Sequence, residues 1–302
     1  FYKKRQILNN LSLKVGSQEI LGMLGPNGVG KSTIFHIITG LKTPTYGKVY
    51  IDKTECTKMP IYERATNFKL GYVPQHGGYI QDLSLIDNLK LVAEIHIKNK
   101  NLREEKVAFI ISQFEFDPLI NLKAKHLSGG QKKKLVIAMS LINDPNILLL
   151  DEPFAALDIL TIKMLQEIII NLQEVQKITV ILCDHQARDL LSCVDRAIVL
   201  SEGKIIASGS PKDIINNSNA QLAYFGDSAL IKNIDTFQIT LAYLCLFTRR
   251  LIISAKYGFF RPDELEKLCH PAPEWSANKT ERKFIGRGWS NPDQYPGLIE
   301  NE

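Results

Sequence analysis

The chain has 302 residues, of which 45% are hydrophobic and 23% charged, a composition ordinary for one large globular domain or two modest ones. Its formal net charge of +5 fits an acidic ligand, a membrane-facing surface or simply a lysine-rich surface. A nucleic-acid-binding protein would concentrate its positive charge far more, so we expect no nucleic-acid partner.

Strand-like and helix-like segments alternate from residue 1 to about residue 229. Short apolar runs typical of strands lie at Ile20–Leu24, Ile147–Leu150, Thr179–Leu182 and Ala197–Leu200, with amphipathic stretches between them. This alternation predicts an α/β domain with a largely parallel sheet and helices on both faces. From about 79 to 142 the periodicity is helical without a clear strand, which predicts a helical subdomain within residues 1–229.

The character of the chain changes after residue 230. Residues 262–302 contain scattered Trp, Asn and Gly together with Pro262, Pro271, Pro273, Pro292 and Pro296. We interpret residues 230–302 as a poorly packed extension or linker of unknown role, with an accessory module as the alternative.

A glycine-rich stretch, Gly-Pro-Asn-Gly-Val-Gly-Lys-Ser-Thr, runs from Gly25 to Thr33 between an apolar run and an amphipathic segment. This is the strand–loop–helix context of a phosphate loop, in which backbone N–H groups at a helix N-terminus surround the β-phosphate. Lys31 is expected to reach the β- and γ-phosphates and Ser32 to bind Mg²⁺. The candidate nucleotide-binding residues of this loop are Asn27, Gly28, Gly30, Lys31, Ser32 and Thr33.

Two acids, Asp151 and Glu152, directly follow the four aliphatic residues Ile147–Leu150. Such a run is typical of a central strand buried on both faces, and its carboxyl end is where open α/β sheets bind ligands. Alone, the pair could equally be a helix N-cap. Downstream of a phosphate loop it predicts that Asp151 holds Mg²⁺ and that Glu152 polarises the attacking water in phosphoryl transfer.

The pentapeptide Leu127-Ser-Gly-Gly-Gln131, between these two motifs, resembles the signature sequence of ABC ATPases. Ser128 and the glycine amides would open a helix whose N-terminal dipole favours a phosphate, and the run Lys132–Lys134 is interpreted partly as a solvated helix face. The resemblance implies a P-loop fold with a RecA-like parallel-sheet core, a small antiparallel β subdomain and a helical signature subdomain. It also implies ATP and Mg²⁺ as cofactors, and a homodimer in which Ser128 and Gly130 contact the ATP bound by the partner.

Four further residues match ABC ATPase positions in the expected order. The resemblance implies that Tyr2 stacks on adenine and that Gln75 contacts Mg²⁺ and links it to the helical subdomain. It implies that Asp158 belongs to the loop crossing to the partner, and that His185 is the switch histidine that contacts the γ-phosphate and acts with Glu152 in catalysis. An ordinary exposed Tyr2 and a structural His185 are the alternatives.

Within the family, several stretches are similar to the ATPases of lipopolysaccharide exporters: Asp151–Ala155, Cys183–His185, Ser201–Gly203 with Gly209–Pro211, and Tyr224–Asp227. Branched-chain amino-acid importer ATPases share much of this pattern and are the alternative. Soluble ABC ATPases carry two cassettes or a long coiled-coil insertion, and neither is present here. A regulatory module without turnover is disfavoured by intact Glu152 and His185.

The resemblance also implies integral membrane permease subunits as partners. An apolar groove near Tyr79, Ile80 and Leu83 is the candidate docking site for a permease helix, with core packing of Leu83 as the alternative. Five cysteines without a CxxC pair predict reduced thiols, hence the cytoplasmic side, and no apolar run is long enough to span a bilayer. We therefore expect a peripheral protein on the cytoplasmic face of the inner membrane. The first residue is Phe1, which we interpret as a truncated start.

Overall fold

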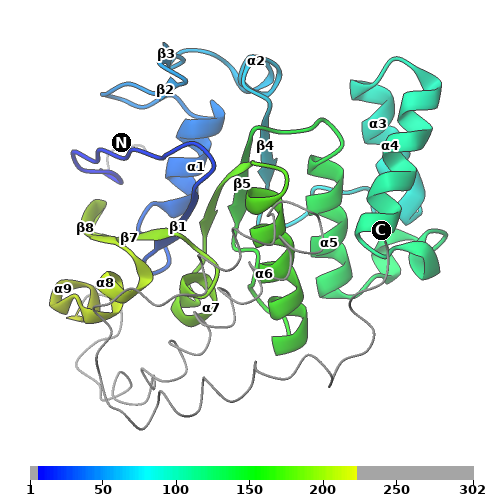
Figure 1. Cartoon of the computed structure of the whole chain (residues 1–302). Coiled ribbons are helices and arrows are strands. Elements are labelled where there is room, and N and C mark those ends of the chain that lie inside the picture. The colour runs from blue at the N-terminus through cyan, green and yellow to red at the C-terminus, as the bar shows by residue number, and fades with distance from the viewer. Residues whose placement is uncertain (1–5, 223–302) are drawn as a thin grey trace, which may run out of the picture. The chain divides into compact units, whose positions relative to one another are not determined.

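The computed structural model describes residues 6–222 (Figure 1). Tyr2, the stretch Tyr224–Asp227, the predicted boundary at 229 and the extension 230–302 lie outside the described residues. The predictions made for them therefore stay predictions.

A six-stranded sheet forms the centre of the domain (Figure 1). Its order is β4 (Leu70–Val73), β5 (Ile147–Asp151), β6 (Thr179–Cys183), β1 (Ile20–Leu24), β7 (Arg196–Ser201) and β8 (Lys204–Gly209). All neighbours pair in parallel except β7 and β8, which pair antiparallel. The predicted, largely parallel α/β sheet is confirmed, and each of the four predicted apolar runs lies within a strand.

The central strands are covered on both faces by helices. Every residue of β1 and β6 is buried, as is β5 after Ile147, which explains why their sequences are continuous apolar runs. The sheet packs against α1 (Lys31–Thr39), α2 (Ile61–Asn67), α5 (Gly129–Ser140), α6 (Ile159–Glu174), α7 (Ala187–Leu191), α8 (Pro211–Asn216) and α9 (Ser218–Ala220).

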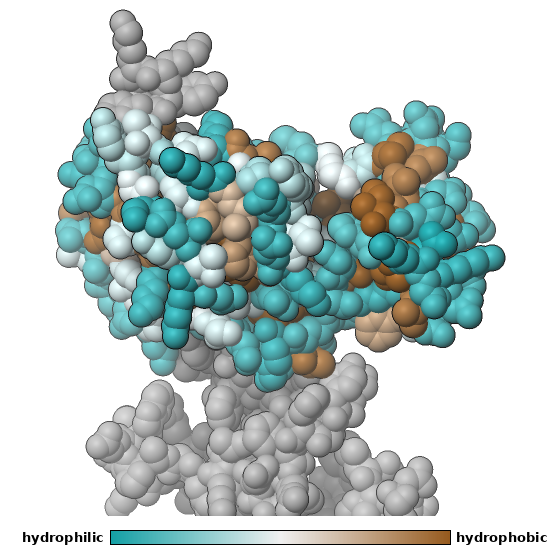
Figure 2. Space-filling view, turned by 90° about the horizontal axis from the view of Figure 1, so that it is seen from above, coloured by the Kyte–Doolittle hydropathy of each residue, from teal (hydrophilic) through white to brown (hydrophobic). Residues whose placement is uncertain are grey.

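Residues 79–142 are mainly helical, in agreement with their periodicity, while the bounds of a helical subdomain stay a prediction. These residues contain α3 (Leu85–His96), α4 (Lys100–Gln113), two 3₁₀ turns (Asp117–Leu119 and Ala124–His126) and α5 (Gly129–Ser140). Within this fully described stretch the β pairing consists of one isolated bridge, Ser84 with Lys123. Figure 2 shows hydrophobic side chains gathered over this helical part of the surface, where Leu91, Ile95, Leu102 and Phe109 are exposed.

A small antiparallel sheet is formed by β2 (Tyr50–Ile51) and β3 (Thr54–Glu55). Ile51 and Cys56 belong to the same buried cluster as Phe35 of α1 and Met23 of β1. This cluster joins the small sheet to the core and holds the helix that follows the glycine-rich loop. Among the helices of residues 6–222, none is both long and apolar enough to cross a membrane.

Candidate functional site

The parallel order β4-β5-β6-β1 brings four loops to one edge of the sheet. Gln75 follows β4, Asp151 and Glu152 end β5, His185 follows β6, and the glycine-rich loop follows β1. Because the carboxyl ends of neighbouring parallel strands meet at the same edge, residues far apart in sequence come together there.

The glycine-rich loop has the backbone conformation that its glycines allow. Gly30 has φ +117° and is the N-cap of α1, and a Cβ added to it would lie 2.8 Å from a methyl carbon of Leu8. At Gly28, with φ +80°, a Cβ would meet nothing within 4 Å, so this part of the loop is open. The buried Lys31 ammonium donates to the carbonyl oxygens of Gly25 (2.6 Å) and Pro26 (3.2 Å). Lys31 therefore sits inside the loop, as a phosphate-binding lysine would.

The buried carboxylate of Asp151 is held by three donors. The Ser32 hydroxyl (3.4 Å) and the Cys183 thiol (2.9 Å) contact Oδ1, and the Tyr72 hydroxyl (3.3 Å) contacts Oδ2. Burial, followed by the charge of Asp151, raises the pKa of the Cys183 thiol and of the Tyr72 hydroxyl. Both groups therefore stay protonated and donate to the carboxylate.

Glu152 lies at the centre of a second set of contacts. Its backbone has φ +48°, and its N–H donates to the carbonyl oxygen of Cys183 at 2.8 Å. Its Oε2 accepts from Nε2 of Gln75 at 2.6 Å and lies 3.5 Å from Nδ1 of His185. The Lys133 ammonium donates to the carbonyl oxygens of both Gln75 and Glu152. Gln75 is thus bonded to Glu152 and not to the Asp151 carboxylate.

Asp184, buried between Cys183 and His185, fixes the loop that carries His185. Its carboxylate accepts from the backbone N–H groups of Phe154 and Gln186, each at 3.0 Å, and lies 3.5 Å from Nδ1 of His185. The loops after β5 and β6 are therefore tied together by a buried carboxylate.

The signature residues lie at the start of α5, next to the start of α6. Ser128 caps α5 in a reciprocal capping box with Gln131, and Asp158 caps α6 through Thr161. A Cβ on Gly130 would lie 2.3 Å from Cγ2 of Thr161. Besides the predicted phosphate contact of its amide, residue 130 must therefore be glycine because the two helix starts pack closely.

The structure brings most of the predicted residues together. Ser32 contacts Asp151, and Gln75 and His185 surround Glu152, while Asn27 and Gly28 are exposed at the open part of the loop. Ser128 and Asp158 form a separate exposed pair of helix caps.

Four contacting residues were assigned no role from the sequence: Tyr72, Lys133, Cys183 and Asp184. Their one signal in the sequence was nearness to a predicted motif: Cys183 and Asp184 directly precede His185, Tyr72 precedes Gln75 by three residues, and Lys133 follows the signature by two. Their contacts depend on the strand order, which the sequence does not reveal. The run Lys132–Lys134 is interpreted as partly a solvated face, and Lys133 does not belong to that part, because its ammonium bonds two carbonyl oxygens of the site.

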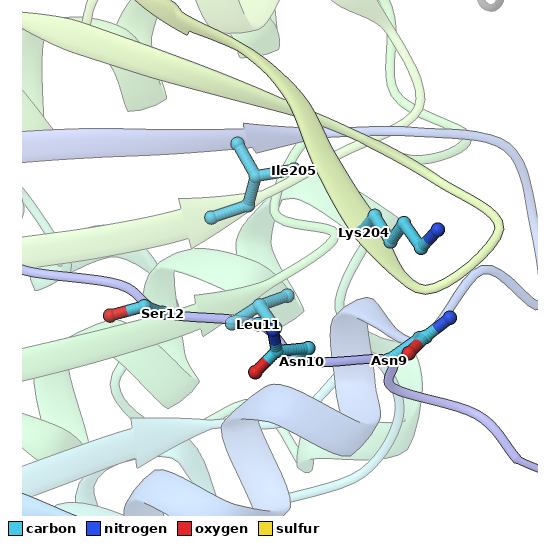
Figure 3. A pocket seen from close by; sticks show the side chains of 6 residues that line it. All are labelled: Asn9, Asn10, Leu11, Ser12, Lys204 and Ile205. Atoms are coloured by element: carbon cyan, nitrogen blue, oxygen red, sulfur yellow. The ribbon is translucent and has the colours of Figure 1, made fainter.

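A different hollow lies away from these residues (Figure 3). It has a volume of about 360 Å³ and is lined by Asn9, Asn10, Leu11, Ser12, Lys204 and Ile205. The close-up shows the first four on an extended N-terminal segment running past the start of β8. Of the predicted catalytic and nucleotide-binding residues that lie within 6–222, none lines it.

Known proteins match this chain over most of its described part. Residues 8–155 match the family model described as ABC transporter. An uncharacterized ABC transporter ATP-binding protein of Rhizobium meliloti is 37% identical, with 75% of this chain and 83% of the relative covered. The lipopolysaccharide export system ATP-binding protein LptB of Haemophilus influenzae is 35% identical, with 75% and 93% covered, and that of Escherichia coli K12 is 34% identical with the same coverage.

Solved structures of ATP-binding cassettes have the same fold as this chain. A dimeric ATP-binding cassette, MJ0796, in a post-hydrolysis state bound to ADP and Pi, superposes with a TM-score of 0.61 at 29% identity, covering 68% of this chain and 90% of that chain. The chain belongs to the ABC transporter family as an ATP-binding subunit close to LptB, and it is an ABC-type ATPase. The predicted P-loop cassette fold is confirmed.

Proposed function

We propose that this protein hydrolyses Mg-ATP as one cassette of a homodimer and powers lipopolysaccharide export. One observation supports the ATP site: the ends of β1, β5 and β6 bring Lys31, Asp151, Glu152 and His185 to one sheet edge. The similarity to LptB of several bacteria supports the choice of cargo.

The residues present fit a magnesium ion. Mg²⁺ prefers oxygen ligands and is usually held by one or two protein groups together with substrate phosphates. The Ser32 hydroxyl and the Asp151 carboxylate supply such oxygens 3.4 Å apart, beside the loop that contains Lys31. We propose Ser32, Asp151 and the side-chain oxygen of Gln75 as the groups that would hold it. Bound there, Mg²⁺ supplies neutralisation of phosphate charge.

The chain's own residues would then bind the triphosphate, orient it and activate the attacking water. The loop N–H groups and Lys31 bind the triphosphate. Asn27, Gly28, Gly30 and Thr33 also surround it, and Tyr2 stacks on adenine. Glu152 accepts a hydrogen bond from the attacking water, and His185 contacts the γ-phosphate. The Gln75 amide donates to Oε2 of Glu152 in this structure, and an ionised carboxylate has further acceptor sites with which it would bond the attacking water.

Dimerisation completes the site in this proposal. Ser128 and Asp158 are exposed, and the hydrophobic Ile159 and Leu160 beside Asp158 are 74% and 78% exposed. Exposed apolar side chains in such a place favour contact with a partner. We propose that Ser128, Gly130 and Asp158 face the ATP bound by the second protomer, as dimeric structures of the similar cassette MJ0796 support.

A permease helix is proposed to dock at Tyr79, Ile80 and Leu83. Ile80 is 47% exposed, whereas Tyr79 and Leu83 are half-buried. The buried Asn88 side chain fixes this loop by bonding both the N–H (2.7 Å) and the carbonyl (3.0 Å) of Ile80. The proposed location is accordingly the cytoplasmic face of the inner membrane.

The test is a pull-down from native membranes with the full chain carrying Glu152→Gln, in the presence of ATP, followed by mass identification of what is recovered. We expect the permease subunits of a lipopolysaccharide exporter. A matched Ile80→Asp sample should lose them. Recovery of amino-acid permease subunits would instead support an importer ATPase. Recovery of a purely soluble complex would contradict a role in transport.

A further inference from the structure

Lys133 bridges three separate segments of the chain. It lies on α5, and its ammonium donates to the carbonyl oxygen of Gln75 at 2.8 Å and to that of Glu152 at 3.1 Å. Gln75 belongs to the loop after β4, and Glu152 to the loop after β5. A single side chain therefore ties the signature helix to both loops.

These bonds close a ring around Glu152. The amide of Gln75 donates to the Glu152 side chain at 2.6 Å, while Lys133 links the backbone carbonyls of the same two residues. The ring fixes Glu152 at its side chain and at its backbone, where φ is +48°. Such a conformation persists only where surrounding contacts hold it.

The Gln75 loop packs closely on α5 at Gly78, where an added Cβ would lie 2.8 Å from a methyl carbon of Val136, but not along its whole length. A hollow of about 150 Å³ lies between them, lined on one side by Pro74–Gly77 and Tyr79 and on the other by Gly129, Lys132, Lys133 and Val136. The charge-assisted bonds of Lys133 cross beside this hollow, and bonds from an ionised donor are stronger than neutral ones.

We propose that Lys133 is a positioning residue that locks Glu152 and the Gln75 loop to the signature helix. When the helical subdomain moves, Lys133 moves both loops with it. The inference rests on the proposed catalytic role of Glu152. It adds to that role a residue outside the signature pentapeptide Leu127–Gln131, acting through two backbone carbonyls.

The test compares Lys133→Met and Lys133→Arg in the full chain. We expect Lys133→Met to lower kcat about tenfold, the scale on which supporting residues around a catalytic group act, with KM for ATP changed less than about twofold. Lys133→Arg, which keeps a cationic donor, should restore most of kcat. Hydrogen exchange of the 74–79 segment should accelerate in Lys133→Met and not in Lys133→Arg.

Lys134→Met is the matched control, because Lys134 is the next residue of α5, is also half-buried, and has its ammonium 5.5 Å from the Phe116 ring centroid. It should leave kcat and the exchange of 74–79 unchanged. Equal losses in Lys133→Met and Lys134→Met, or wild-type kcat in Lys133→Met, would overturn the proposal. Glu152→Gln, assayed in parallel, separates the two claims: its normal turnover would refute the role of Glu152 itself, whatever Lys133→Met does.

Discussion

Arg64 is a fully buried cation whose hydrogen bonds hold the far end of the phosphate-loop helix. Its guanidinium donates to the carbonyl oxygens of Ile37 and Ile38 in α1 and to those of Thr57 and Met59 before α2. A cation at a helix C-terminus also complements the helix dipole. Arg64 thereby anchors the helix that begins with Lys31.

Arg64→Met should lower the free energy of unfolding by about 3 kcal/mol, because it leaves several buried carbonyls without donors. Urea denaturation of the full chain measures this change. The control is Arg103→Met, which removes a surface pair with Glu94 at 3.7 Å and should cost below about 1 kcal/mol. Equal losses in the two variants would contradict the anchoring role.

Site residues were predictable where their residue type and spacing carry the chemistry. Lys31, Ser32, Asp151 and Glu152 follow strands at fixed positions, so local sequence was enough. Arg64 and Lys133 could not be found in this way, because their partners are backbone carbonyls, which every residue possesses and which only the fold brings within reach.

At the scale of elements, the starts of α5 and α6 depend on each other. The two signature glycines differ in surroundings: a Cβ on Gly129 would lie 3.5 Å from Leu157, whereas one on Gly130 would lie 2.3 Å from the Thr161 methyl. The capped end of α5 thus fits against α6 only if residue 130 lacks a side chain.

Gly130→Ala should therefore destabilise the protein by about 1–3 kcal/mol, the usual cost of overpacking. Gly129→Ala should be tolerated in the same thermal unfolding measurement. Thr161→Ser removes the clashing methyl and keeps the hydroxyl bond to Asp158, so adding it to Gly130→Ala should recover part of the loss. A Gly130→Ala protein as stable as Gly129→Ala would show that the two helix starts can separate freely.

Strands were predicted best where they are buried on both faces, because burial requires a continuous run of apolar residues. The runs that became β1, β5, β6 and β7 are continuously apolar because both faces of these strands are covered. The order β4-β5-β6-β1 was not predictable in this way, since strand neighbours are set by crossovers that leave no local pattern. That order is what places Gln75, Glu152 and His185 together.

At the scale of the whole molecule, the predicted site residues fall on two separate surfaces. One sheet edge carries Lys31, Asp151 and Glu152, while Ser128 and Asp158 are exposed at separate helix starts. In the proposed dimer, Ser128 and Asp158 of each protomer complete the partner's site. Within a protomer, Lys133 links the sheet edge to the helix α5 that begins after Ser128. The family was recognisable from the sequence because its motifs are short and local.

The most direct test of this account is the steady-state rate of ATP hydrolysis by the full chain and by its Glu152→Gln variant, at saturating Mg-ATP. The variant keeps the size of residue 152 but replaces one acceptor oxygen by an NH2 donor, and so removes the carboxylate that would activate water. We predict that the rate falls at least about 100-fold, the lower range for loss of a general base. Hydrolysis by Glu152→Gln at the wild-type rate would contradict the assignment of this sheet edge as the catalytic site.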